Sequence, residues 1–425
     1  MKKTLLIIFA ILTSRFLPAQ PLPQWSSSIS SNFLNYTYDN PKMKMDNAGD
    51  LVVVASVDNG STGRDIIVIK YTPSGSIIWQ QIFNGISNQD DVAGDFGIDS
   101  LNNIFITGGT ATDSVNSDLI TFKYFPNGSF DWLNTYSGAA NGRDMGQSID
   151  VDQTGNSYVT GYTSIDTSGN QKLITAKIDS SGNTVWTDSY GADSIASYEG
   201  NKIRILNNEI AVLGRYISHT NYIDKYIAMR LDTSGTSIFA NEGIITRGMS
   251  SYHIDNIGNF YFGARISFKI TKVNANGNFA WLDSIPTNLP FNVTGDELKA
   301  ITSDTMQNIY VTGRHYGDDY GGPTYSNADI LVIKYAPGGN QIWSRRYEYQ
   351  SNNAADIGND ITLDNNMNIY VAGQSERQLT DYDYVVIRYD VNGTEIGSIR
   401  YNDTASGDDV ITSMVVEDSV NIYVT

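Results

Sequence analysis

The 425-residue sequence contains no cysteine. Disulfide bonds, thiolate metal sites, a cysteine nucleophile and a lipidated N-terminal cysteine are therefore excluded. Histidine is scarce too, because only His219, His253 and His315 occur and they form neither a His-x-His nor a His-x-x-x-His pair. A Gly-x-Ser-x-Gly elbow and a phosphate-binding glycine loop are also missing, so no motif points to a catalytic centre.

Positive charge is in short supply. The chain carries 28 Lys and Arg residues against 46 Asp and Glu residues, for a formal net charge of −18. An acidic surface repels phosphate backbones and anionic lipids, so we expect no nucleic-acid partner and no adhesion to an anionic membrane. Charged residues make up only 17%, whereas 38 glycines and 27 tyrosines occur. This mixture is typical of many short strands joined by tight turns.

Long hydrophobic runs are missing as well. Residues 5–12 form a short apolar run, too short to span a bilayer comfortably, and no later run is long enough. Two lysines precede this run, and Ala19 closes a plausible cleavage site. We therefore expect a signal peptide at residues 1–19 and an exported mature chain at residues 20–425, extracellular or at the cell surface, with the periplasm as an alternative. A membrane anchor is the competing interpretation of the same run.

A short apolar phrase recurs along the chain. It ends in a glycine in most copies, and Gly108, Gly161 and Gly214 follow one another at a spacing of about fifty residues. The clearest copies lie at 103–108, 157–161, 308–313 and 368–373. Weaker copies lie at 51–55, 209–214, 259–263 and 421–425. A fixed period of this length is the signature of a repeat architecture.

Three further phrases accompany each copy. The pattern Asp-x-x-Val-Ile-Lys-Tyr follows it, as at 65–71, and an apolar phrase precedes it, as at 148–152. The last phrase is a turn glycine with an aromatic residue four positions later, as in Gly128 and Trp132. Each phrase alternates apolar and polar residues, which is the period of a half-buried strand. Each repeat is therefore predicted to be a four-stranded antiparallel meander.

One such sheet cannot bury both of its faces, whereas sheets stacked around an axis bury them against their neighbours. We therefore expect an all-β fold, a β-propeller of four-stranded antiparallel blades with seven complete repeats plus a partial eighth that begins near Asp409. The segment around Trp25 is expected to act as a closing outer strand of this truncated eighth blade, which would still lack its third strand. A seven-bladed ring with two spare strands is the alternative.

These phrases resemble the bacterial β-propeller repeat family, also called SBBP-type repeats. The resemblance rests on Asn-Ile-Tyr-Val-Thr-Gly at 308–313, Asp-Ile-Leu-Val-Ile-Lys-Tyr at 329–335 and Gly-x-x-x-Trp at 339–343, and it extends over residues 40–425. Proteins of this family are exported or displayed at the cell surface, and the resemblance implies the same for this chain. It implies a scaffold and says little about function, because the family is defined by its fold.

The recurring tryptophans and cations have both a structural and a functional interpretation. Tryptophans in the fourth strand can form platforms for sugars, but their equal placement in successive repeats favours packing between blades. One basic residue in each third strand can form a cationic ring or a structural charge pair, and we favour the pair. Gly-x-x-x-Trp also resembles the tryptophan-docking repeats of quinone-dependent dehydrogenases. Their Ala-x-Asp start and vicinal cysteines are missing here, so we expect no quinone cofactor.

Acidic residues recur just before the first strand of most repeats. If these strands are innermost, the carboxylates can ring one mouth of the channel and hold a hard cation. The alternative is that each carboxylate accepts hydrogen bonds from its own turn, and we favour this. No cofactor is expected beyond such a structural cation. The candidate metal ligands are Asp91, Asp144, Asp296, Asp356 and Asp409, with Glu199 at the equivalent position of another repeat.

The connections between blades, and between the second and third strands, share one face and vary in length. Variable loops on a rigid scaffold are where binding usually resides. The outstanding loop spans residues 314–325 and is rich in tyrosine and aspartate. A tolerated insertion is the alternative explanation of its length. The candidate ligand-binding residues are Arg314, Tyr316, Asp318, Asp319, Tyr320 and Tyr325.

These features favour a non-enzymatic binding or scaffold propeller that presents its variable loops to a glycan or protein ligand. We expect it to be a monomeric ring. A hydrolase or lyase that acts on polysaccharide through carboxylates at the channel mouth is the first alternative. A structural spacer within a larger surface protein is the second. Carboxylates with raised pKa values, clustered at that mouth, would favour the enzyme. We expect no membrane insertion of the mature chain.

Overall fold

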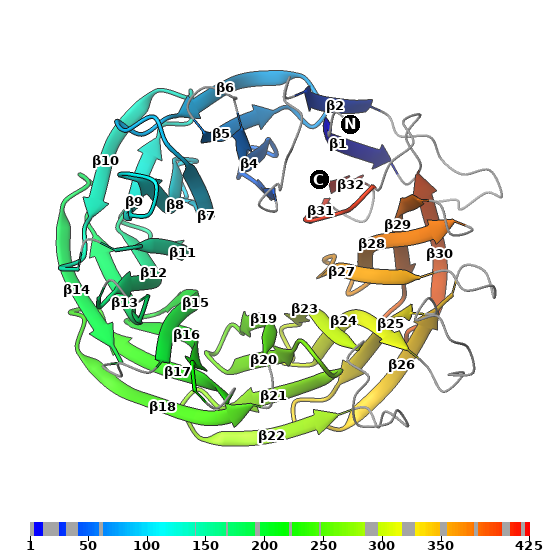
Figure 1. Cartoon of the computed structure of the whole chain (residues 1–425). Helices are drawn as coiled ribbons and strands as arrows, with labels where there is room; N and C mark the ends of the chain where they lie inside the picture. The colour runs from blue at the N-terminus through cyan, green and yellow to red at the C-terminus, as the bar shows by residue number, and fades with distance from the viewer. Residues whose placement is uncertain are drawn as a thin grey trace. The chain divides into compact units, whose positions relative to one another are not determined.

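The computed structural model describes residues 4–11, 25–30, 41–58, 63–140, 142–166, 169–191, 196–220, 223–245, 248–284, 296–316, 328–348, 355–377, 381–401, 409–417 and 421–425. In these ranges every helix or strand is a β-strand, numbered β1 to β32 in Figure 1. The same ranges contain no helix long and apolar enough to cross a membrane. The chain divides into two compact units, and we describe each by itself.

The first unit consists mainly of residues 28–246. Its first two sheets are four-stranded antiparallel meanders of consecutive strands. One contains β3 (Lys42–Met45), β4 (Leu51–Asp58), β5 (Arg64–Tyr71) and β6 (Ile77–Phe83). The other contains β7 (Asp91–Ile98), β8 (Ile104–Ala111), β9 (Ser117–Tyr124) and β10 (Phe130–Tyr136).

The next eight strands of this unit form one sheet. Two antiparallel meanders make it up, and a single parallel pairing of Gln171 with Ser197 joins them. The first meander contains β11 (Met145–Val151), β12 (Ser157–Ser164), β13 (Gln171–Ile178) and β14 (Thr184–Tyr190). The second contains β15 (Ala196–Leu206), β16 (Glu209–Ser218), β17 (Asp224–Asp232) and β18 (Ser237–Ile245).

The second unit consists mainly of residues 247–274 and 279–425. It holds three more four-stranded sheets of consecutive strands. They are β19 (Met249–Ile254), β20 (Phe260–Ala264), β21 (Lys269–Val273) and β22 (Phe279–Ser284); β23 (Glu297–Ser303), β24 (Ile309–Tyr316), β25 (Ala328–Tyr335) and β26 (Gln341–Tyr347); and β27 (Asp356–Leu363), β28 (Ile369–Arg377), β29 (Asp381–Tyr389) and β30 (Glu395–Tyr401).

One further sheet draws its strands from both ends of the chain. Its order is β2 (Trp25–Ser30), β1 (Thr4–Ile11), β32 (Asn421–Val424) and β31 (Met414–Glu417). The expectation that this blade lacks its third strand is therefore wrong, because β1 pairs antiparallel with β32 in that place. β1 also lies within the segment for which the sequence predicts a signal peptide. The same residues are therefore assigned to a leader by the sequence and to a strand of the end sheet by the structure.

The fold class predicted from the sequence is confirmed as an all-β propeller with four-stranded antiparallel blades. The predicted count of seven complete repeats plus a partial eighth is met only in part, since five sheets of consecutive strands stand alone and one sheet is eight-stranded. The reason is local. The long strand β15 begins at Ala196, early enough for Ser197 to pair with Gln171 of the preceding meander.

The hydrophobic cores lie between successive four-stranded meanders rather than within any one of them, including the two meanders of the eight-stranded sheet. Val52 and Val68 of the first sheet pack with Phe96, Ile106 and Phe122 of the second. The same kind of core recurs between the next sheets of the first unit and between the sheets of the second. Within each unit, the first strand of a sheet lies at its inner edge and the fourth at its outer edge (Figure 1). Both faces of a middle strand are thereby buried.

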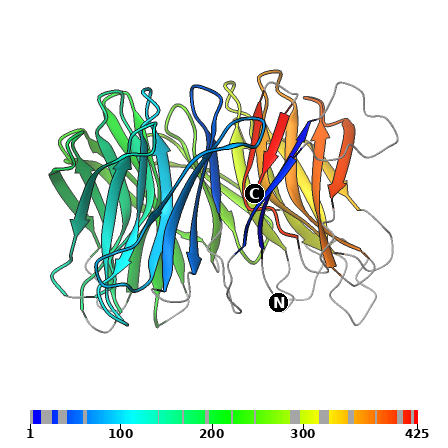
Figure 2. The same cartoon turned by 90° about the horizontal axis from the view of Figure 1, so that it is seen from above.

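Tight turns join the first strand of each sheet to the second, and most use one side-chain arrangement. Asp304 accepts hydrogen bonds from the backbone N–H groups of Met306 and Asn308, and the Asn308 amide donates to the same carboxylate. The Tyr310 hydroxyl donates to it as well, at 3.0 Å. Asp255 and Asp364 make the same set of contacts. Figure 2 shows such hairpin turns at the ends of the strands.

A tryptophan at the outer edge of one sheet docks onto the next sheet. The Trp132 indole N–H donates to the carbonyl of Ser180 at 3.1 Å, and the ring lies under the turn glycine Gly182. Gly182 has φ of +86°, and a Cβ there would lie 2.7 Å from the indole, so only glycine suits both the turn and the contact. Trp79, Trp186, Trp281 and Trp343 repeat this contact, and Phe239 replaces the indole under Gly277.

Removing one such ring should destabilise the protein strongly. Trp132 is only 9% exposed, and Trp132→Ala should lower the free energy of unfolding by about 3–5 kcal/mol, because a buried contact and an indole hydrogen bond are lost together. Urea unfolding would measure this change. The control is Leu133→Ala on the exposed side of the same strand, which should change stability by less than about 1 kcal/mol. Equal effects of the two substitutions would contradict the docking role.

Candidate functional site

The acidic residues before the first strands are buried and hydrogen-bonded within their own sheets. Asp144 accepts from the backbone N–H groups of Gly138 and, at 3.0 Å, of Ser164. Asp91 accepts from the N–H of Gly85 at 2.6 Å. In both cases the carboxylate ties the chain that enters the first strand to the rest of the blade. This arrangement matches the interpretation favoured from the sequence, a carboxylate that serves its own turn.

The candidate metal ligands are not brought together. Within the described ranges, no three His, Asp or Glu side chains gather in a way that would hold an ion. Asp356 instead accepts a hydrogen bond from the Ser375 hydroxyl, and the backbone N–H of Asp409 donates to Tyr382 at 2.8 Å. Each of these residues begins a different sheet. The described geometry therefore does not support a cation shared among them.

The variable loop predicted to bind a ligand is described only at its stem. Arg314 and Tyr316 lie in the last three residues of β24. The other candidates, Asp318, Asp319, Tyr320 and Tyr325, lie outside the described residues. The backbone N–H of Tyr316 donates to Asp296 at 2.8 Å, and His315 Nδ1 lies 3.1 Å from the same carboxylate. Arg314 lies 3.6 Å from Glu297. The candidate metal ligand Asp296 thus anchors the loop stem.

The basic residues of the third strands serve separate contacts rather than a common ring. Lys70 pairs with Asp46 at 2.7 Å, and Lys123 pairs with Asp131 at 2.9 Å. In other repeats the cation lies over the tyrosine of the second strand, as Lys334 does over Tyr310. Each contact fixes the third strand against its own repeat. The structure therefore agrees with the interpretation of these residues as structural cations.

A group of charged residues between the last two complete sheets of the second unit was not found from the sequence. Asp329 of β25 is 2% exposed and pairs with Arg346 of β26. Burial raises the pKa of Asp329 to about 6; the Arg346 guanidinium opposes this rise, while Glu348 and Asp356 add to it. The available signal was an arginine in the fourth strand, at a position where Thr135 and Ser189 stand in earlier repeats.

Asp356 lies next to a second buried ion pair, that of Arg400 with Asp383. Arg400 of β30 donates to the Ser375 hydroxyl and, at 3.0 Å, to Asp383, and Ser375 in turn donates to Asp356. Arg400 is 8% exposed and Asp356 is fully buried. The carboxylates are therefore occupied by cations and a hydroxyl. The pKa of Asp329 is raised, as a general acid would need, but the oxygens of these carboxylates are enclosed by protein.

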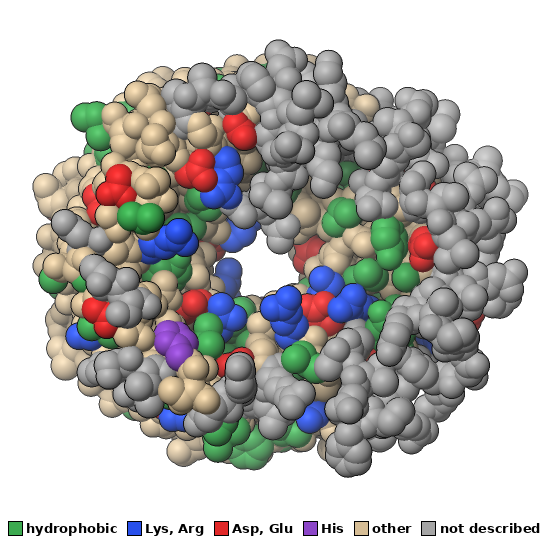
Figure 3. Space-filling model, viewed as in Figure 1, with side chains coloured by type: hydrophobic (Ala, Val, Ile, Leu, Met, Phe, Trp, Pro, Cys, Tyr) green, Lys and Arg blue, Asp and Glu red, His purple; other side chains and the backbone are tan. Residues whose placement is uncertain are grey.

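A second cluster that sequence reasoning missed lies on the first strands of the first unit. Three lysines surround one buried carboxylate, Asp95 of β7, as described below. In Figure 3, basic side chains gather over the region that β7, β11 and β15 occupy in Figure 1. The signal in the sequence was charge at equivalent positions of two first strands, where Asp95 aligns with Lys202 by register.

The comparisons with known proteins concern the repeat and the fold. The SBBP β-propeller repeat matches residues 135–170 and 342–376. No curated protein sequence matches the chain. Each of these two matched segments runs from a fourth strand into the second strand of the following repeat. The SBBP-type repeat recognised from the sequence is thereby confirmed in these two segments.

Several solved structures are similar at low identity. The periplasmic gluconolactonase PpgL of Pseudomonas aeruginosa is 13% identical with a TM-score of 0.48, covering 85% of this chain and 98% of its own. A putative 6-phosphogluconolactonase of Bacteroides fragilis is 11% identical with a TM-score of 0.47, covering 88% and 98%. A puromycin hydrolase is 10% identical with a TM-score of 0.49, covering 86% and 55%. At these values the similarities carry no information about activity.

The raised pKa of Asp329 predicts a pH-dependent stability difference. The folded protein binds this proton more tightly than the unfolded chain, whose aspartate titrates near 3.8. The stability that protonation contributes is therefore present below about pH 4 and lost as the pH rises through about 6. Wild type should gain stability relative to Asp329→Asn when the pH falls from about 7 to about 4.

Urea midpoints of the two proteins at both pH values would measure this difference. Arg346→Met provides a second variant, since loss of the guanidinium should raise the pKa of Asp329 further and move the transition to higher pH. A constant difference between wild type and Asp329→Asn across this range would contradict the raised pKa.

Proposed function

Since this chain is a β-propeller protein that carries SBBP-type repeats, we propose that it is an exported, non-enzymatic binding or scaffold protein that presents its variable loops to a glycan or protein ligand. One observation carries the proposal. The side chains that recur from repeat to repeat, such as Trp132, Asp304 and Lys70, are engaged in contacts that hold the scaffold together. Recognition is thereby left to residues that do not recur.

The loop stem beside β24 supports this site. Asp296 holds both the Tyr316 backbone and the His315 ring, so the residues that enter the loop leave the sheet from a fixed position. Arg314 is oriented by Glu297 of the neighbouring strand. A rigid stem lowers the entropy that a loop loses when it binds, which is the usual reason for placing recognition on such a scaffold.

We also propose a repeat count of eight. The strands from β3 to β30 fall into seven successive meanders, if the eight-stranded sheet is counted as two. The sheet of β31, β32, β1 and β2 would be the eighth, assembled from the two ends of the chain. We further propose a monomer without a bound cofactor, with a structural cation as the exception, and without nucleic-acid or membrane partners.

An enzyme that acts on polysaccharide is the second candidate, and the raised pKa of Asp329 is the observation that favours it. Glycoside hydrolysis needs one carboxylic acid that stays protonated and a second that is ionised. Asp329 has the raised pKa that the first of these needs, and Asp356 is a second carboxylate near it, but Arg346 and Ser375 occupy their oxygens. We therefore place binding first. A structural spacer in a larger surface protein would need neither site.

The loop hypothesis predicts that three tyrosines are needed for ligand capture. Replacing Tyr316, Tyr320 and Tyr325 together with alanine should abolish binding to the best ligand on a glycan and peptide array, because stacking rings supply much of the contact area in such sites. The melting temperature should change little. Ile257→Ala, an exposed residue in a hairpin turn, is the control and should bind normally. Unaltered capture by the triple variant would remove the loop from consideration.

The export hypothesis predicts processing of the N-terminus. Expression with the native leader in a bacterial host should release a chain that begins at Gln20, and intact-mass spectrometry would show it. Such cleavage removes β1, so it also decides between the two assignments of residues 4–11. A cell-associated protein that retains Met1 would contradict export through this leader.

A further inference from the structure

The first strands of the first unit concentrate positive charge in an otherwise acidic protein. Lys42 and Lys44 of β3 lie 3.7 and 3.6 Å from Oδ1 of Asp95, and Lys202 of β15 lies 3.7 Å from its Oδ2. Arg204 follows two residues after Lys202, on the same side of β15. The carboxylates that face the group are Asp95 and Asp150 of β11. Three lysines therefore surround the one carboxylate of Asp95 and exceed its charge by two.

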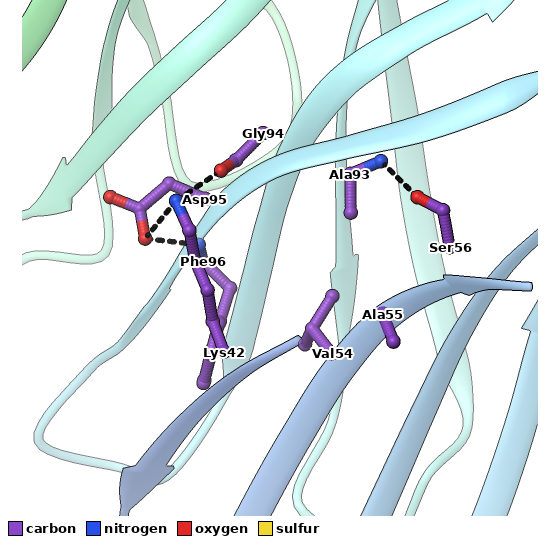
Figure 4. Close-up of a pocket in the computed structure, with 8 residues that line it drawn as sticks. All are labelled: Lys42, Val54, Ala55, Ser56, Ala93, Gly94, Asp95 and Phe96. Atoms are coloured by element: carbon purple, nitrogen blue, oxygen red, sulfur yellow. Dashed lines mark hydrogen bonds and ion pairs between the residues drawn. The ribbon is translucent and has the colours of Figure 1, made fainter. Parts of the chain in front are cut away.

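Asp95 compensates only part of the positive charge of the three lysines. The three lysine–carboxylate distances of 3.6–3.7 Å are longer than a hydrogen bond. Its oxygens are used instead by the N–H of Phe96 at 2.9 Å and the hydroxyl of Ser148 at 3.1 Å. Figure 4 shows Lys42, Asp95 and the carbonyl of Gly94 in one group. Lys42 and Lys44 each donate to a backbone carbonyl of β7, those of Gly94 and Phe96.

The lysines keep donors and access to solvent. An ammonium group has three N–H donors, and one carbonyl uses one of them. The side chains of Lys42, Lys44 and Lys202 are 43%, 40% and 43% exposed. Partial burial of the ammonium lowers the pKa of Lys44; Asp95 opposes this effect, while Lys202 and Lys42 lower the pKa further. The mutual repulsion of the lysines is therefore only partly compensated.

The adjoining pocket is too small to hold the ligand itself. Lys42, Ser56, Ala93 and Gly94 line a crevice between β4 and β7 with room for about one water molecule (Figure 4). The Ser56 hydroxyl there accepts the N–H of Ala93 at 2.9 Å. A ligand must therefore lie over the exposed ammonium groups and not inside the wall.

We propose that Lys42, Lys44 and Lys202 form a binding site for a tetrahedral oxyanion, a sulfate or phosphate group. A surplus of two positive charges matches such a group, and its four oxygens offer more acceptors than the one carboxylate already present. This site is distinct from the loop at 314–325, which lies in the second unit. The oxyanion can be free in solution or an ester on a glycan, and the two sources share the same recognition.

The test uses calorimetric titration of the full chain at low ionic strength with sodium sulfate, and sodium chloride as the reference salt. Wild type should bind sulfate. Lys202→Gln should weaken binding at least about fivefold, the factor that one unit charge at about 4 Å contributes in a water-like dielectric. Asp95→Asn should tighten binding by a similar factor, because it removes the competing anion. Lys225→Gln, whose lysine pairs with Glu242 on β18, is the control and should change nothing.

A sulfated galactose tetrasaccharide and its desulfated form separate the two sources. Tighter binding of the sulfated sugar, weakened by Lys202→Gln, supports the proposal and identifies a glycan ester as the ligand. Binding of sulfate alone supports a free anion. If Asp95→Asn fails to fold, the paired results for Lys202→Gln and Lys225→Gln decide. No sulfate binding by wild type, or equal binding by these two variants, overturns the proposal.

Discussion

The contact between an outer-edge aromatic ring and the next repeat's turn glycine is the constraint on which the rest of the structure depends. The Trp132 indole binds the carbonyl of Ser180 and lies against Gly182, whose positive φ and missing Cβ are both required. The contact joins residues about fifty positions apart, so it sets the repeat length as well as the packing of sheet on sheet. Each Gly-x-x-x-Trp turn therefore takes part in two contacts, as Gly128 receives Trp79 while Trp132 packs against Gly182.

Polar residues that recur are committed to the same task. The aspartate of each tight turn collects backbone N–H groups, an asparagine amide and often a tyrosine hydroxyl, as Asp304 does. Because those groups would otherwise be buried without partners, their loss would cost stability. This explains why an acidic, tyrosine-rich chain without cysteine can hold its blades together by core burial and hydrogen bonds. It also explains why repeated residues are poor candidates for recognition.

The strands themselves could be predicted from the sequence, and particular residues show where this prediction fails. The alternating phrase at 329–335 predicted β25, and the aromatic spacing from Gly128 to Trp132 predicted β10. The pairing of Gln171 with Ser197 could not be predicted, because one parallel bridge depends on where two strands of different repeats begin. The third strand of the end sheet was missed for a related reason, since β1 lies far from β32 in the sequence.

The candidate sites, too, were predicted from the sequence only in part. Spacing alone placed a carboxylate at the start of most first strands. Only the fold shows that Asp296 binds the loop stem, while Asp356 is linked to Arg400 through Ser375. The lysines around Asp95 were invisible as a group, since β3, β7 and β15 each contribute a part. By itself the sequence determined the strands, the turns and the repeat length, because hydrophobic period, turn glycines and aromatic spacing are local properties. Which charges meet was decided only by the tertiary structure, because stacking places side chains from separate repeats within Coulombic reach.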